Sequence, residues 1–336
     1  MKSLEFTDYV ELYFRQYAPE QRGLSSHTIS SYSDAILLFF RYYDLKHNIK
    51  PNKIDFQEIN KERVLGYCHW LENEQKCSTA TRNQRLTAIH SVMRYIMGET
   101  PMYSGLCRSI LAIKMKKIQK KPPVYLSVDA TKQLFKMFDT RNQAEFRDLV
   151  LLCLMYDSGI RVQELIQLRL FNLSLSEKTL LTVTGKGNKV RTLPLSSKTA
   201  ELLRRYIEQD SEITSERFLF INRSGKPLTR AGIGYILTKY FNLLKETFDG
   251  HLPEKISPHT LRHSKATHLL YEGVNLIYIR DFLGHSTVVT TEIYASTNPE
   301  FLRKAFETAD DLINPSTYYR PEKKMELIEF LKQIRK

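Results

Sequence analysis

The stretch that decides the fold is residues 257–270, "SPHTLRHSKATHLL". A serine followed by proline favours the start of a helix, because serine caps it and proline suits the first helical position. His259 and Arg262 are three residues apart and share a helix face, and His263 lies one turn beyond His259. At a helix start, free backbone N–H groups and the positive end of the helix dipole add to the charge of these cationic side chains. The stretch therefore predicts an anion site.

Two other interpretations compete for the same stretch. His259 and His263 have the i, i+4 spacing of zinc ligands, but Thr260 stands where the metalloprotease pattern has glutamate. No cluster of cysteines or acids completes such a site, so no metal is predicted. The second alternative is a helix whose histidines pack or cap without function. Taken alone, the stretch leaves that alternative open.

Composition limits the class of protein. The chain has 336 residues, which suits two domains, and its 42% hydrophobic and 26% charged residues are typical of a globular protein. No apolar run is long enough to span a bilayer, and the N-terminus lacks a signal-peptide core. The four cysteines form no C-x-x-C pair. These features predict a cytoplasmic protein with no membrane contact.

The charge favours a polyanionic partner. There are 50 Lys+Arg against 37 Asp+Glu, a net charge of +13, and the pI is about 9.4. The stretch "KMKKIQKK" at 114–121 holds five lysines and precedes two prolines, which predicts a basic linker between two domains. Within it Lys117, Lys120 and Lys121 are expected to follow a DNA backbone; a solvated helix end is the alternative.

Residues 1–113 are predicted to be entirely helical. Apolar spacing and capping residues give helices over 6–17, 25–45, 60–74 and 78–98, the last capped by Gly98. Hydroxyl and arginine side chains gather at the helix starts, where backbone N–H groups suit DNA phosphates. We therefore expect DNA contacts from Ser26, Thr28, Thr79, Arg82 and Arg85. For any single Ser or Thr, plain N-capping explains the residue equally well.

The rest of the chain has a different pattern. Helices are predicted over 124–138, 145–159 (continuing to 170), 198–210 and 230–248, with short strands over 180–183 and 190–195. The strands flank "TGKGNK", whose glycines suit a hairpin turn. The expected fold is mainly α: an all-helical N-terminal domain plus an α+β domain with a small antiparallel sheet. The expected boundaries are 1–113, a linker over 114–123, 124–312 and a tail helix in 313–336.

Four segments of the second domain carry a resemblance. They are "SGIRVQELIQL" (158–168), "TGKGNKVRTLPL" (184–195), "HTLRHSKATHLL" (259–270) and "LGHSTVVTTEIYAS" (283–296). Together, and in this order, they resemble the motifs of the tyrosine recombinases, the family of phage integrases and Xer-type recombinases. The match covers the family's catalytic domain, and residues 1–113 resemble its helical core-binding domain more loosely.

The resemblance implies a set of site residues. The catalytic positions are Arg161, Lys186, His259, Arg262, His285 and the nucleophile Tyr294, with Glu164 in support. His263 and His268 fall outside this set, and packing or solvent exposure is expected for them.

These residue types suit phosphodiester chemistry. Two arginines can neutralise the non-bridging oxygens and hold the transition state. A phenol becomes a covalent nucleophile when a base such as His259 accepts its proton, while His285 donates a hydrogen bond to the phosphate. Lys186 can protonate the leaving 5′-oxygen. A 3′-phosphotyrosine keeps the bond energy, so no cofactor, ATP or metal is expected.

The resemblance also implies partners. We expect the two domains to clamp duplex DNA at an inverted-repeat core site and four copies to exchange strands through a Holliday junction. Apolar stripes in 299–313 and 322–336 predict tail helices, one of which would dock on a neighbouring copy or, alternatively, on its own chain. The first helix begins near residue 5, which leaves no room for an arm-binding domain.

Several functions stay open at this point. Integration or excision of a mobile element is favoured over Xer-like dimer resolution, because the N-terminal domain and tail are long. A type IB topoisomerase uses similar tyrosine chemistry, and a DNA-binding regulator could retain the fold without activity. An accessory recombinase or a directionality factor is also left open.

Overall fold

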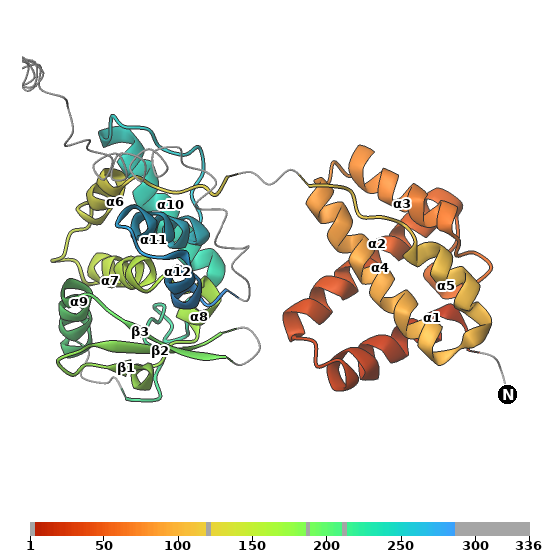
Figure 1. Cartoon of the computed structure of the whole chain (residues 1–336), viewed down its shortest axis with the longest axis horizontal. Helices are drawn as coiled ribbons and strands as arrows, with labels where there is room; N and C mark the ends of the chain where they lie inside the picture. The colour runs from red at the N-terminus through yellow and green to blue at the C-terminus, as the bar shows by residue number, and fades with distance from the viewer. Residues whose placement is uncertain (1–3, 119–121, 186–188, 210–213, 286–336) are drawn as a thin grey trace, which may run out of the picture. The chain divides into compact units, whose positions relative to one another are not determined.

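The computed structural model describes residues 4–118, 122–185, 189–209 and 214–285. The chain divides into two compact units, Met1–Lys120 and Lys121–Lys336 (Figure 1). Lys120, Lys121, Lys186, Tyr294 and both predicted tail helices lie outside the described residues.

The described residues of the N-terminal unit form helices joined by turns and loops, without a strand. Its helices are α1 (Phe6–Leu12), a π-helix (Tyr13–Gln21), α2 (Ser26–His47), α3 (Lys61–Asn73), α4 (Thr79–Glu99) and α5 (Ser104–Leu111), with 3-10 turns at Pro51–Lys53 and Pro101–Tyr103. Ser25, Asn60 and Ser78 cap α2, α3 and α4 by accepting backbone N–H bonds. Buried aromatic rings, such as those of Tyr43 and Tyr67, fill the core between these helices.

Three details of this unit differ from the prediction. The first helix widens into π geometry from Tyr13, in a segment where Pro19 lacks the N–H of a regular rung. Gly98 does not cap α4, which ends at Glu99 because Thr100 precedes Pro101 and is extended (φ −141°, ψ 108°). The helix α5 was not predicted.

The C-terminal unit combines helices with a small sheet. Its helices are α6 (Val128–Phe135), α7 (Gln143–Ser158), α8 (Val162–Ile166), α9 (Ser197–Glu208), α10 (Arg230–Thr247), α11 (Pro258–Tyr271) and α12 (Leu276–Leu283), with a 3-10 turn at Leu170–Asn172. Strands β1 (Leu173–Ser174), β2 (Leu180–Thr184) and β3 (Val190–Pro194) form an antiparallel sheet in the order β1-β2-β3. The mainly α fold class is confirmed, and β1 adds a third strand to the predicted hairpin.

The core of this unit brings four helix ends to one place. Helix α7 packs between α9 and α11, and α11 also packs on α12 (Figure 1). Gly159 ends α7 with φ +57°, and a Cβ there would lie 2.8 Å from the Phe282 ring, so only glycine fits. The C-terminal ends of α7 and α12 therefore meet the beginnings of α8 and α11.

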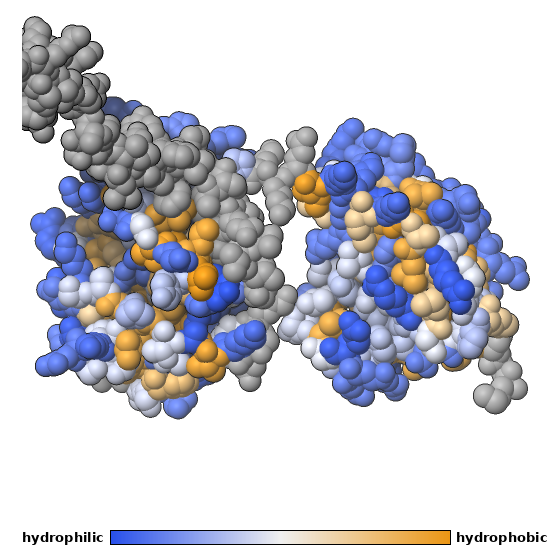
Figure 2. Space-filling view, viewed as in Figure 1, coloured by the Kyte–Doolittle hydropathy of each residue, from blue (hydrophilic) through white to orange (hydrophobic). Residues whose placement is uncertain are grey.

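The surface is mostly polar. Hydrophilic residues surround smaller apolar areas on the face of both units seen in Figure 2. In the part of the chain that the structure describes, no helix is long and apolar enough to cross a bilayer.

Candidate active site

Arg161 lies at the turn between α7 and α8, where its backbone is extended and caps α8. Its backbone N–H donates to Glu164 Oε2 (2.8 Å) and its guanidinium NH1 donates to Glu164 Oε1 (2.9 Å). Its NH2 donates to the carbonyl of Gly284, 123 residues further along the chain (3.0 Å). The guanidinium is thus held between the start of α8 and the end of α12.

Arg262 projects from the second turn of α11 and is buried. Its guanidinium donates to the carbonyl oxygens of Gly159 and Leu283, at the C-terminal ends of α7 and α12. The negative ends of two helix dipoles stabilise a cation at this position. Arg161 and Arg262 therefore both donate to carbonyls at the C-terminal end of α12, those of Gly284 and Leu283.

The histidines beside these arginines are neutral at pH 7. Loss of hydration, and then the cations of Arg262, Arg230 and Arg161, lower the pKa of His259. Burial and the charges of Arg262 and Arg161 lower the pKa of His285 to about 4. A neutral imidazole can accept a proton or donate a hydrogen bond without first losing one.

Glu164 is a buried carboxylate. Burial alone would raise its pKa, but hydrogen bonds from Arg191 and from the Arg161 backbone outweigh that effect and lower it. Arg191 NH1 and NH2 donate to Glu164 Oε1 (3.0 Å) and Oε2 (2.8 Å). The carboxylate is thus ionised and shared by two arginines.

The structure brings four of the six predicted catalytic residues together, namely Arg161, His259, Arg262 and His285, with Glu164 beneath them. Lys186 and Tyr294 lie outside the described residues. Gly185, just before Lys186, is next to the site, since a Cβ on it would lie 3.2 Å from Glu164 Oε1. Within the described ranges, no three His, Cys, Asp or Glu side chains group as metal ligands.

Comparison with known proteins identifies the family of this chain. The profile of the phage integrase family matches residues 125–300, and that of the phage integrase N-terminal SAM-like domain matches residues 12–100. The chain belongs to the phage integrase family. Its members are tyrosine recombinases, enzymes that cut and rejoin DNA, and this chain is one of them.

Individual relatives cover most of the chain. A protein named as an integrase/recombinase, y4rC of Sinorhizobium fredii, is 29% identical over 97% of both chains. The tyrosine recombinase XerD of Staphylococcus saprophyticus is 32% identical over 85% of this chain and 93% of its own. One relative is thus named as an integrase/recombinase and the other as a Xer recombinase.

Solved structures share the fold. The Tn1549 transposon integrase in complex with transposon right end DNA superposes with a TM-score of 0.68, at 16% identity over 89% of this chain and 98% of that one. The lambda integrase tetramer bound to a Holliday junction gives a TM-score of 0.64, at 16% identity over 87% of this chain and 78% of that one.

Two residues around the candidate active site were not predicted from the sequence. Arg191 pairs with Glu164, and Arg230, at the start of α10, adds positive charge near His259. The signal for Arg191 was its alternation with Leu193, which places both on the inward face of β3. An inward arginine needs a buried anion, and Glu164 is that anion.

The two histidines outside the predicted set are not at the open surface. Burial and the nearby His259 and Arg262 lower the pKa of His263 to about 4, and the rings of His259 and His263 are 6.4 Å apart. His268 is buried, and its Nε2 donates to the Leu126 carbonyl (2.9 Å). His268 therefore joins α11 to the segment that enters the C-terminal unit.

The predicted DNA-contacting residues of the N-terminal unit differ in how exposed they are. Ser26 is exposed and Thr79 is half-buried at the first positions of α2 and α4, while the Thr28 hydroxyl lies 2.9 Å from that of Ser25. Arg82 is only 3% exposed and donates to Asn83 Oδ1 (3.0 Å). Its burial argues against the predicted phosphate contact.

Arg82 and Asn83 hold the first part of the linker instead. Arg82 also donates to the Lys114 carbonyl (3.4 Å). Asn83 exchanges hydrogen bonds with the backbone N–H and carbonyl of Lys116, at 3.1 and 2.8 Å. Lys117 follows as an exposed residue. The linker therefore leaves the N-terminal unit from a fixed point on α4.

A polar hollow of about 320 Å³ lies between α2 and α4. Its lining consists of His27, Ser30, Ser31, Asp34, Gln84 and Arg85. Gln84 Nε2 donates to Ser31 Oγ across it (2.6 Å). Of these residues only Arg85 was predicted from the sequence, because the others become neighbours only when the two helices pack.

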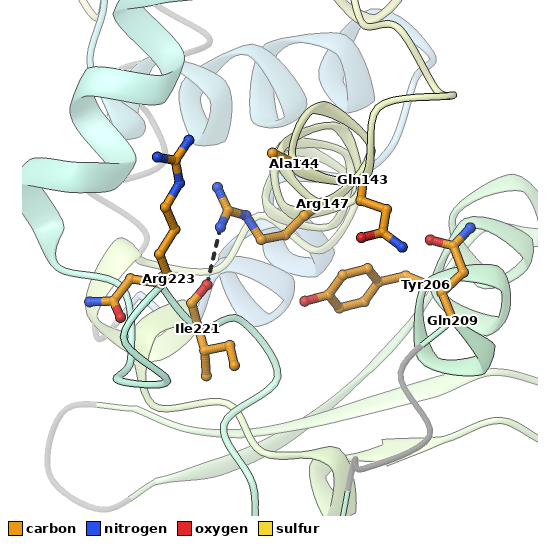
Figure 3. Close-up of a pocket in the computed structure, with 8 residues that line it drawn as sticks. Gln143, Ala144, Arg147, Tyr206, Gln209, Ile221 and Arg223 are labelled. Carbon is orange, nitrogen blue, oxygen red and sulfur yellow. Dashed lines mark hydrogen bonds between the residues drawn. The ribbon is translucent and has the colours of Figure 1, made fainter.

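A second hollow, of about 300 Å³, belongs to the C-terminal unit but not to the active site (Figure 3). Gln143, Arg147, Tyr206 and Arg223 are part of its lining, and Arg147 donates to the Ile221 carbonyl (3.2 Å). It lies at the beginning of α7, about 24 Å from the other end of that helix, which Arg161 follows, at 1.5 Å per residue. None of the predicted site residues lines it.

Proposed function

We propose that this protein is a site-specific integrase that cuts and rejoins DNA through a phosphodiester bond to Tyr294. The observation that carries the proposal is the convergence of Arg161 and Arg262 on the C-terminal end of α12, next to the neutral histidines His259 and His285. Such a site can neutralise a phosphate and still accept a proton.

The arginines act on charge. A phosphodiester repels an attacking oxygen, and the charge on its non-bridging oxygens grows in the transition state. Guanidinium groups that are already fixed by Glu164, Gly284 and Leu283 need no reorganisation when this charge develops. They therefore favour the transition state over the bound ground state.

Protons move through the remaining groups. His259 accepts the phenol proton of Tyr294, whose oxygen bonds to phosphorus as the bond to the 5′-oxygen breaks. Lys186 gives a proton to that leaving oxygen, and His285 donates a hydrogen bond to the phosphate. The reverse sequence, with a 5′-hydroxyl from another strand, rejoins the DNA without an external energy source.

The biological role is the insertion or excision of a mobile element. The two units grip duplex DNA, with Ser26, Thr28, Thr79 and Arg85 on the N-terminal unit and Lys117, Lys120 and Lys121 of the linker against phosphates. Four copies act on an inverted-repeat site in nucleoid DNA and pass through a Holliday junction. The likeness to the transposon integrase and lambda integrase complexes supports this role.

A covalent trap tests the proposal. Wild-type protein and Tyr294→Phe are incubated with sheared DNA from the source organism and quenched with SDS, and the DNA that stays bound to protein is sequenced. We expect wild-type adducts at one inverted-repeat site and none with Tyr294→Phe.

The other outcomes separate the alternatives. Adducts without sequence preference would indicate a type IB topoisomerase. Normal DNA binding without adducts would indicate a regulator. Adducts at a chromosomal site that does not mark the end of a mobile element would indicate Xer-like dimer resolution.

A further inference from the structure

Arg191 connects three segments of the active site. It lies on β3, at the base of the hairpin that carries Lys186, and its side chain is 14% exposed. Its guanidinium makes the two hydrogen bonds to Glu164, 27 residues earlier in the chain. Glu164 in turn holds Arg161. Arg191 thus acts on Arg161, which is expected to bind the phosphate, through the one residue Glu164.

Two glycines have their Cα atoms close to the same guanidinium. A Cβ on Gly284 would lie 3.0, 3.1 and 3.2 Å from NH1, Cζ and Nε of Arg191. A Cβ on Gly185 would lie 3.1 Å from its NH1. Arg191 therefore occupies the space that side chains at both positions would need. The residues that follow these glycines are His285 and Lys186, both in the predicted catalytic set.

The charge balance of the cluster explains why a second arginine is needed. A carboxylate that is 6% exposed needs cationic partners to stay ionised. With Arg191 present, Arg161 uses one terminal nitrogen for Glu164 and the other for the Gly284 carbonyl. Without Arg191, Glu164 would draw Arg161 more fully to itself or take up a proton. Either change alters the position of the Arg161 guanidinium.

We propose that Arg191 is a positioning residue for DNA cleavage, which sets Arg161 through Glu164 and sets the His285 turn through Gly284. It does not touch the phosphate. The inference rests on the proposed DNA cleavage, and it adds a fixed cation that links the hairpin to the turn of Arg161 and to the turn of His285. Its loss should slow cleavage while DNA binding is retained.

The test is single-turnover formation of the Tyr294 adduct on a nicked duplex that carries the site recovered in the covalent trap. We expect Arg191→Met to slow adduct formation about 100-fold, because a displaced Arg161 no longer acts as a donor to the transition state. Arg191→Lys should form the adduct about tenfold faster than Arg191→Met, because lysine keeps the charge but not the paired hydrogen bonds. The Kd for the duplex should change less than about twofold, because phosphate contacts are retained.

Arg204→Met is the matched control. Arg204, on α9, is also partly buried and donates to Thr179 Oγ1 (3.1 Å) and to the Ser176 carbonyl (3.3 Å), away from the site. We expect its adduct formation to equal that of the wild type. A defect equal to that of Arg191→Met would mean that loss of any buried arginine slows the reaction, which would overturn the positioning role.

A neutral substrate separates positioning from structural damage. A methylphosphonate at the scissile position lacks one non-bridging charge, so it depends less on the arginine that neutralises that charge. The ratio of wild-type to Arg191→Met rates should fall from about 100 to less than about 10 on this substrate. An unchanged ratio would overturn the inference. If wild type itself forms no adduct, the proposed function fails and the inference falls with it.

A second pair of variants addresses the possibility that Arg191→Met does not fold. Gly284→Ala pushes a methyl group against Arg191, whereas Gly273→Ala has nothing within 4 Å of its new Cβ. Both glycines have positive φ, +65° and +80°, so both variants carry similar backbone strain. We expect slow adduct formation only for Gly284→Ala. Equal rates for the two variants would contradict the role of the contact with Arg191.

Discussion

Burying a guanidinium costs free energy unless its N–H groups form hydrogen bonds. Those of Arg262 donate to main-chain carbonyl oxygens. The carbonyls of Gly159 and Leu283 lie at the ends of two helices, where peptide dipoles leave partial negative charge. The orientation of Arg262 therefore depends on where α7 and α12 end. Gly159 and Gly284, which take positive φ just after these ends, belong to the site as much as the charged residues do.

The histidines of this cluster make stability depend on pH. His263 and His285 have pKa values of about 4 in the folded protein, below the ordinary value of 6.5. Between these values the unfolded chain binds more protons, so the free energy of unfolding falls as pH falls from about 6.5 to 4. Above about 6.5 this contribution is fully present.

Urea unfolding at a series of pH values checks this expectation. Wild type should lose stability steadily over that window, and His263→Gln should show a shallower slope because one titrating group is gone. The same slope in both proteins would contradict the assignment of His263 as a buried neutral group.

At the scale of elements, α11 is tied to the chain just after the linker. Ser264 Oγ accepts the Leu126 N–H (2.9 Å), and His268 Nε2 donates to the Leu126 carbonyl (2.9 Å). Lys265 pairs with Asp157 near the end of α7 (3.1 Å). The helix that presents His259 and Arg262 is therefore fixed along its length by contacts behind the site.

Ser264→Ala tests the first of these ties. The change leaves the buried Leu126 N–H without its acceptor, which should lower the free energy of unfolding by about 1–3 kcal/mol. Ser197→Ala, on an exposed position of α9, should change it by less than about 0.5 kcal/mol. Urea unfolding measures both variants, and equal small losses would show that the Ser264 bond contributes little.

At the scale of the whole molecule, each unit has its own hydrophobic core. The core of the N-terminal unit consists of residues between Phe6 and Ile113, and that of the C-terminal unit begins at Leu126. Because each of these cores is built from described residues of its own unit, each unit has the burial that independent folding requires.

The fragment 1–120 should therefore fold by itself. We expect a helical circular dichroism spectrum and one cooperative urea transition, because its buried residues contact one another. A broad transition without a folded baseline would show that the fragment depends on the rest of the chain. The fragment 121–336 provides the matched measurement for the second unit.

The sequence by itself determined most of the elements and the order of the predicted catalytic residues. Ser25, Asn60 and Ser78 act as caps within three residues of the N–H groups they satisfy, so local chemistry is enough to predict them. The spaced motifs likewise predicted Arg161, His259, Arg262 and His285, which the fold brings together.

Only the tertiary structure decided which polar side chains are buried and what they hold. Its residue type and its place near the start of α4 predicted Arg82 to be an exposed DNA contact. The residue is instead buried and donates to the Lys114 carbonyl. Arg191 meets Glu164 across 27 residues, and Arg161 meets Gly284 across 123. The spacing of residues along the chain does not predict which of them form such pairs, because the packing of the elements sets the distance between their side chains.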